Sequence, residues 1–322
     1  MSIDALTARE IRWVDDAPHE DDLAAVVGIV AADEVEVLGE VATHERQVRD
    51  HLHSPYADRA ATALLFAGAR AVGMVSVEHD ELAHHTFLNL AAAPGDGRSE
   101  VLATGVSLGT EAAVRLRRER GGIPWEVRCG TWLPDATYHD LLGGLGFAAI
   151  RRFSQMRIDA TSPLVPESAP PLPPGVEIVV VNHEEGYRAM YDVDCAAFVD
   201  HWGFVAHPYD EWCRELVDSP SRDPEGMWLL TVDGVPAGIC LLDDSRLDLD
   251  DGYVGILGVL AEFRGRGLAQ LLLRTAFVRD RDLGRAGTRL GVDTENSTGA
   301  VRLYEGVGMT AVLVREAWGR SL

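Results

Sequence analysis

The chain has 322 residues, with a hydrophobic fraction of 47% and a charged fraction of 25%. These values are typical of a folded globular protein, and the length favours two domains with separate cores. The formal net charge of −22 argues against nucleic acid or an anionic membrane as a partner, because phosphate groups would be repelled, and it favours a small cationic molecule.

Single residue types exclude further classes. All 29 basic residues are arginine, which rules out a Schiff-base lysine and the lysine of a phosphate-binding P-loop. The longest apolar stretch, residues 23–32, is too short to span a membrane, and no export signal is visible. The four cysteines lack the spacing of zinc or disulfide motifs. We therefore expect a cytoplasmic protein without a metal site.

The first half of the chain ends in a proline-rich segment. Before it, residues 64–78 (LLFAGARAVGMVSVE) have the pattern of a β-hairpin, and residues 141–153 read LLGGLGFAAIRRF. Residues 161–175 (TSPLVPESAPPLPPG) contain six prolines and predict a semi-rigid linker. This predicts two domains, residues 1–160 and 176–322.

The second half alternates between the periods of helix and strand. Its predicted strands are residues 228–232, 237–242, 253–259, 288–293 and 310–318. Its predicted helices are residues 184–198 and 209–217, one that begins near 268 and ends near 284, and a short one at 300–307. This order predicts an α/β domain with helices on a central sheet.

The two halves resemble each other at a shift of about 160 residues. LLGGLGFAAIRRF aligns with LYEGVGMTAVLVR at 303–315, and the hairpin at 64–78 aligns with WLLTVDGVPAGICLL at 228–242. One fold that has been duplicated is the simplest interpretation.

The stretch EFRGRGLAQLLL, residues 262–273, joins a predicted strand to a predicted helix. A helix N-terminus offers unpaired N–H groups and a partial positive charge, and glycines let an anion approach the backbone closely. Seven arginines lie between Arg264 and Arg289 against two acidic residues, Asp280 and Asp282. This predicts a polyanionic ligand, and the alternative is a tight turn followed by an exposed arginine-coated helix. The GxGxxG pattern of dinucleotide-binding folds is absent.

The context of this turn resembles the GCN5-related N-acetyltransferase (GNAT) superfamily. The family's acetyl-CoA loop, Arg/Gln-x-x-Gly-x-Gly/Ala, is matched by Arg264, Gly267 and Ala269. A later family element is matched by Asn296, Ala300, Leu303-Tyr304-Glu305 and Gly308-Met309. With the strands and helices around these motifs, the resemblance covers about residues 228–314.

The resemblance implies an α/β (α+β) fold of two tandem GNAT-like domains, each a mixed central sheet flanked by helices. It implies acetyl-CoA-dependent transfer of an acetyl group to a primary amine of a small molecule, by direct attack in a ternary complex. The cofactor-binding residues implied are Leu257, Gly258, Val259, Arg264, Gly265, Arg266, Gly267, Leu268, Ala269 and Asn296.

Catalytic roles also follow from the resemblance. Tyr304 matches the general acid near the CoA sulfur, although its position also suits a core aromatic residue. A backbone N–H of Gly258 or Val259 would stabilise the oxyanion. Asp251 is the candidate base, with a solvated acidic loop as the equally good alternative. His201 and Trp202 are candidates for substrate contact, or else pack a helix end.

The first half departs from the family pattern. Its counterpart of the acetyl-CoA loop reads AAAPGDGRSEV at 91–101, with Asp96 where an anion would bind, and Leu142 aligns with Tyr304. We expect a degenerate, non-catalytic domain. A non-catalytic acyl-CoA-binding protein and a protein lysine or N-terminal acetyltransferase remain alternative functions, and an oligomer is compatible with the sequence.

Overall fold

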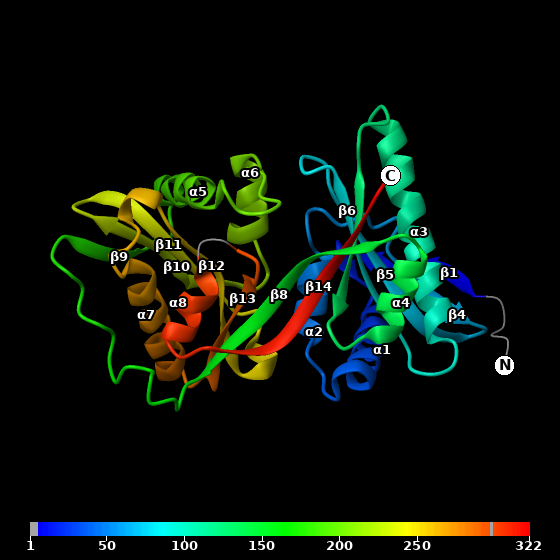
Figure 1. The fold of residues 1–322 in the computed structure, drawn as a ribbon, viewed down its shortest axis with the longest axis horizontal. Helices are drawn as coiled ribbons and strands as arrows, with labels where there is room; N and C mark the ends of the chain where they lie inside the picture. The colour runs from blue at the N-terminus through cyan, green and yellow to red at the C-terminus, as the bar shows by residue number, and fades with distance from the viewer. Residues whose placement is uncertain (1–5, 297–298) are drawn as a thin grey trace. The chain divides into compact units, whose positions relative to one another are not determined.

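A computed structural model describes residues 6–296 and 299–322. These residues form two compact α/β units (Figure 1). The first unit comprises the described residues up to Arg152 together with Val314–Leu322, and the second comprises the described residues of Phe153–Leu313.

The first unit is a six-stranded sheet with helices on both faces. Its strands come in the order β1-β4-β5-β6-β7-β14, and only the pair β6 and β7 is parallel. The strands are β1 (Thr7–Glu10), β4 (Ala63–Ala67), β5 (Arg70–Asp80), β6 (His85–Ala92), β7 (Glu126–Trp132) and β14 (Thr310–Ser321), beside a small hairpin of β2 (Trp13–Val14) and β3 (Ala17–Pro18). The helices are α1 (Glu20–Leu38), α2 (Glu45–Leu52), α3 (Arg98–Glu119) and α4 (Ala136–Gly144).

The second unit repeats this plan with the strand order β8-β13-β12-β11-β10-β9, in which β12 and β13 are parallel. Its strands are β8 (Ala148–Asp159), β9 (Val176–Val180), β10 (Arg222–Val232), β11 (Val235–Asp243), β12 (Asp251–Val259) and β13 (Gly287–Asp293). Its helices are α5 (Glu184–Phe198), α6 (Tyr209–Trp212), α7 (Leu268–Asp282) and α8 (Ala300–Gly306). A π-helical turn, η1 (Cys213–Val217), continues α6, and two 3-10 turns flank β12: η2 (Leu247–Leu249) and η3 (Ala261–Phe263).

Strand alternation places two hydrophobic cores on opposite faces of the second sheet. Trp228 and Leu230 of β10 pack with α7 and α8, whereas Met227 and Leu229 pack with α5. Figure 1 shows α5 and α6 on one side of this sheet and α7 and α8 on the other. The strands and helices predicted for residues 184–318 are thereby confirmed.

Each sheet is completed by a strand from the other half of the sequence. Residues 315–321 of β14 pair antiparallel with residues 126–132 of β7. Residues 153–159 of β8 pair antiparallel with residues 287–293 of β13. The compact units therefore differ from the predicted boundaries 1–160 and 176–322, because a hydrophobic pattern locates a strand but does not identify its neighbours.

The proline-rich segment 161–175 lies within the second unit and contacts it. Val165 is buried in the core beneath α7, and the guanidinium of Arg281 on α7 donates hydrogen bonds to the carbonyl oxygens of Pro166 (2.5 Å) and Glu167 (3.1 Å). This segment has neither helix nor strand, as predicted, but it packs against one unit instead of forming a free connection.

Matching backbone hydrogen bonds confirm the duplication. The N–H of Met309 donates to the carbonyl of Tyr304, and the N–H of Phe147 donates to the carbonyl of Leu142, both at 3.0 Å. Leu142 is therefore the structural counterpart of Tyr304.

Candidate functional site

The parallel strands β12 and β13 separate halfway along their length. They are paired only from Asp251 to Val254 on β12 and from Gly287 to Leu290 on β13. The register between β11 and β12 shifts at the same level, so that Gly255 is an extra residue on β12. Among the described residues, the carboxyl half of β12 has no strand partner on the β13 side. A ligand can reach its backbone there.

Residues 260–267 carry β12 into α7 and leave the helix N-terminus open. Gly265 (φ 75°) and Gly267 (φ 77°) adopt the left-handed conformation, and a Cβ at either would meet nothing within 4 Å. No acidic side chain stands in the first turn of α7, and no side chain caps it. The first N–H groups of the helix therefore remain available to an anion.

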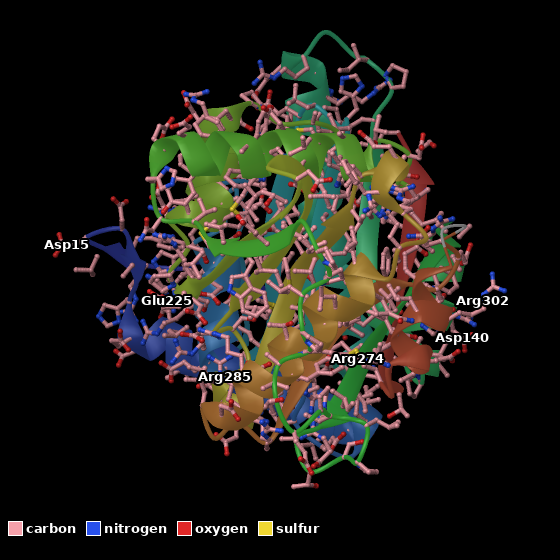
Figure 2. All side chains as sticks on the ribbon, turned by 90° about the vertical axis from the view of Figure 1, so that its left-hand side faces the viewer. Asp15, Asp140, Glu225, Arg274, Arg285 and Arg302 are labelled. Atoms are coloured by element: carbon pink, nitrogen blue, oxygen red, sulfur yellow. The ribbon has the colours of Figure 1, made fainter. Side chains whose placement is uncertain are left out.

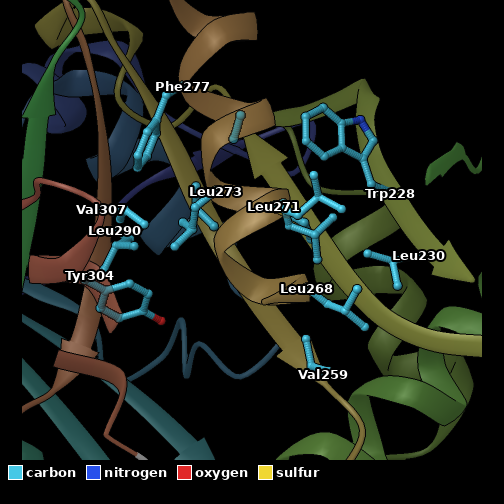
Figure 3. Close-up of a cluster of buried hydrophobic side chains, with 14 of the residues drawn as sticks. Trp228, Leu230, Val259, Leu268, Leu271, Leu273, Phe277, Leu290, Tyr304 and Val307 are labelled. Carbon is cyan, nitrogen blue, oxygen red and sulfur yellow. The ribbon is translucent and has the colours of Figure 1, made fainter. Parts of the chain in front are cut away.

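Hydrophobic packing holds this helix N-terminus in place. Leu268, Leu272 and Leu273 are at most 3% exposed and pack into the core that includes Val259, the last residue of β12. Figure 3 shows Leu268, Leu273 and Val259 in this core. The turn therefore begins and ends on buried residues, while the glycines between them stay exposed.

The arginines near this loop fall into two groups. Most are engaged: Arg264 donates from Nε to the carbonyl of Val259 and from Nη2 to the carbonyl of Ala197 in α5, both at 3.0 Å. Arg279, Arg281, Arg285 and Arg289 pair with carboxylates. Arg266 and Arg274 are exposed and form no ion pair with any residue that the structure describes (Arg274 is labelled in Figure 2). The predicted excess of positive charge therefore comes from Arg266 and Arg274. Arg264 instead holds the loop against β12 and α5 through its hydrogen bonds.

Tyr304 lies on α8 at the edge of the same core. It is 8% exposed, and Figure 3 shows its hydroxyl directed away from Leu290 and Val307. Burial raises the pKa of Tyr304 to about 12. The hydroxyl makes no hydrogen bond to any described residue. This geometry is compatible with both roles predicted for Tyr304, a packed aromatic residue of the core and a general acid.

Helix α5 ends directly over β12. A Cβ at Gly258 would lie 3.0 Å from the ring of Phe198 and 3.1 Å from the Cβ of Ala197, so glycine is required for this close approach. The ring centroids of Phe198 and His201 are 4.6 Å apart. The sequence gives no signal for Phe198, because its contact with Gly258 joins residues sixty positions apart and leaves no local pattern.

His201 meets Asn296, which follows β13. The Nε2 atom of His201 is 3.3 Å from the side-chain amide of Asn296. Trp202 is 39% exposed, and its ring centroid lies 6.3 Å from that of Phe153, the partner of Asp293 in the sheet. The structure thus brings His201, Trp202 and Asn296 to the carboxyl end of β13.

Asp251 lies at the opposite end of β12. Eight residue steps of about 3.3 Å put it about 26 Å from Val259. It is 1% exposed, and its carboxylate accepts hydrogen bonds from Arg157 (both at 2.9 Å) and Arg289 (2.5 Å). The geometry contradicts the predicted base role, because this buried carboxylate is held by two guanidinium groups far from the loop.

The first unit keeps the separated strands but closes the region near them. Strands β6 and β7 pair only from His85 to Leu88 and from Glu126 to Cys129. The connection to α3 is shorter, at five residues (93–97) against eight (260–267). Arg98 begins α3, is 7% exposed and is bound to Asp33 (2.7 Å) and Asp135 (2.5 Å). With Leu142 in place of Tyr304, this unit lacks the features that mark the second.

Within the described ranges, no group of three or more His, Cys, Asp or Glu side chains could hold a metal ion. None of the described helices is both long and apolar enough to cross a membrane.

Solved structures with the same architecture identify the class of fold. A GCN5-related N-acetyltransferase from Sphaerobacter thermophilus has a TM-score of 0.76 at 22% identity, covering 98% of this chain and 95% of that one. A tandem GNAT protein from the clavulanic acid biosynthesis pathway has a TM-score of 0.72 at 15% identity, covering 98% of both chains. The fold is that of a tandem N-acetyltransferase, as predicted.

The model of the acetyltransferase (GNAT) family matches residues 187–309, which lie in the second unit. Curated relatives are named mycothiol acetyltransferase, in agreement with a tandem architecture of the mycothiol synthase type. The protein from Thermobispora bispora is 31% identical over 53% of this chain and 57% of its own length, and that from Frankia alni is 30% identical over 64% of each. The protein from Geodermatophilus obscurus is 26% identical over 97% of both chains.

Proposed function

We propose that the second unit transfers an acetyl group from acetyl-CoA to a primary amine of a small, cationic molecule, by direct attack within a ternary complex. The observation that carries this proposal is the open glycine turn at the N-terminus of α7, placed at the end of a strand that has separated from its parallel neighbour. The mycothiol acetyltransferase relatives support a small-molecule acceptor.

The residues present fit the anionic cosubstrate. The unpaired N–H groups of Leu268 and Ala269, next to Gly265 and Gly267, suit a pyrophosphate, and Arg266 is free to add charge. On the side of β12 that faces β13, residues 255–259 pair with no described strand, which suits an extended amide-containing chain that would bind as a strand does.

Four residues of this chain would then act on the reactants. A backbone N–H of Gly258 or Val259 stabilises negative charge on the carbonyl oxygen under attack. The hydroxyl of Tyr304 is protonated at neutral pH, because its pKa is raised to about 12, and it protonates the departing sulfur. Asp200 and Asp293 lie near the end of β13 and attract a cationic amine.

Isothermal titration of acetyl-CoA into the purified chain tests the binding half of the proposal. We expect one site per chain. Two sites would show that the first unit also binds the cosubstrate, and the absence of binding would refute the proposal. Thiol release from acetyl-CoA in the presence of small primary amines then tests transfer, and binding without any release would favour a non-catalytic acyl-CoA-binding protein.

A further inference from the structure

The side chains of Phe198 and His201 lie between the separated strands, in edge-to-face contact. Phe198 rests on the backbone of β12 at Gly258, and His201 lies against Asn296 beyond the end of β13. Because the two rings are in edge-to-face contact at 4.6 Å, the imidazole is held at the mouth of the gap from both sides. It lies next to the strand whose backbone N–H groups would face the reacting carbonyl.

The surroundings keep this imidazole neutral near pH 7. Burial lowers the pKa of His201 below its ordinary value, and the charge of Arg264 acts in the same direction. Asp293 on β13 and Asp200 on the adjoining loop oppose this effect. The imidazole of His201 can therefore accept a proton near the separated strands. Asp251, at the other end of β12, cannot take this role.

We infer that His201 accepts the proton of the substrate ammonium and that Asn296 is the positioning residue that orients its ring. This inference rests on the proposed function and names a residue that the function requires. The structure places the Nδ2 atom of Asn296 next to Nε2 of His201, and a half-turn of the amide exchanges its nitrogen and oxygen. With its oxygen toward the ring, Asn296 accepts from Nε2–H of His201, which leaves the lone pair on Nδ1 for the substrate. Nδ1 makes no hydrogen bond to any described residue.

Each proton and electron pair of the transfer can be assigned to the residues named. The ammonium gives one proton to Nδ1 of His201, and the freed nitrogen lone pair forms the new C–N bond. The C–S bond breaks with its electron pair on sulfur, which takes the proton of Tyr304. The attacking nitrogen then gives its surplus proton back to Tyr304, and His201 releases its own proton to solvent. One amide, one thiol and one proton result.

Titration of the free protein tests the pair without any ligand. Histidine side-chain NMR signals are followed against pH, and the signal of His201 is assigned by its loss in His201→Gln. We expect His201 to titrate at lower pH than an ordinary histidine, as its burial dictates. His183 is exposed and caps the N-terminus of α5. Asn296→Asp should move the midpoint of His201 upward by about one pH unit, because it places a carboxylate opposite the ring.

Kinetics separate proton transfer from packing. With an alkylamine acceptor, the kcat/KM of the wild type should decrease at acid pH, where His201 is protonated. His201→Gln should lower kcat/KM by about 10²- to 10⁴-fold and should abolish this decrease. Asn296→Asp should shift that fall toward higher pH. With methoxyamine, which is already neutral at pH 7, the loss in His201→Gln should be much smaller, since no proton has to be removed before attack. His183→Asn keeps a helix cap and serves as the control with an unchanged profile.

The outcomes distinguish this inference from the proposed function. Wild-type protein that neither binds acetyl-CoA nor releases thiol would overturn both. Wild-type turnover together with an unaltered pH profile in His201→Gln, or an equal loss for alkylamine and methoxyamine, would overturn only the role of His201. A titration of His201 that Asn296→Asp leaves unmoved would overturn the role of Asn296.

Discussion

The substitution Asp251→Asn separates a structural ion pair from a catalytic base. Asp251 is 1% exposed, while the side chains of Arg157 and Arg289 that it binds are 22% and 15% exposed. Loss of the negative charge leaves two largely buried guanidinium groups without a counter-charge. Removal of one partner of a buried ion pair lowers the free energy of unfolding by about 3–5 kcal/mol. Partial exposure of the arginines and the retained amide oxygen place our expectation near the lower end, about 3 kcal/mol.

Urea unfolding followed by tryptophan fluorescence measures this loss, and the melting temperature should fall by about 6–12 °C for a unit of this size. Asp159→Asn is the matched control, because Asp159 contacts the same Arg157 (3.3 Å) from an exposed position. It should change stability little. Acetyl-CoA affinity should be unchanged in both variants. A fully stable Asp251→Asn protein without turnover would refute the structural role and restore Asp251 as the base.

Three further substitutions test the site and the fold. Gly267→Asp places a carboxylate at the N-terminus of α7 and should abolish acetyl-CoA binding in titration, whereas Gly284→Asp, at a left-handed position past the other end of α7, should not. Tyr304→Phe should lower kcat by about 10²- to 10⁴-fold with little change in KM, and equal turnover would reduce Tyr304 to packing. Burial raises the pKa of Asp280 to about 6, so its protonated form favours the fold. The free energy of unfolding is measured against pH for the wild type and for Asp280→Asn. From pH 4 to pH 6.5 the value for the wild type should fall by about 2 kcal/mol relative to the variant, and an equal pH dependence in both proteins would contradict this.

The glycine turn could be predicted because its signal is local. Gly265, Gly267 and the apolar positions of α7 stand within a dozen residues, and each follows from the backbone conformation or helix period that it serves. The side chain of Arg264 was not predictable in the same way. Its sequence position is equally suited to a phosphate ligand and to the backbone carbonyls that it binds, and only tertiary packing against α5 decides between them.

Contacts that join distant residues leave no local pattern. Asp251 binds Arg157 and Arg289, which come from two other strands, and the length of β12 places this carboxylate at the end of the strand opposite the loop. The environment of His201 depends on Phe198, Gly258 and Asn296, which come from three separate segments. Its neighbours could therefore be known only once the sheet had been assembled.

The strand that completes the first sheet has a consequence for synthesis of the chain. Strand β7 pairs with residues 315–321, so its outer edge stays open until the ribosome has added those residues nearly two hundred positions later. An open strand edge invites pairing with other chains. We therefore expect separate expression of residues 1–160 to give an aggregation-prone product.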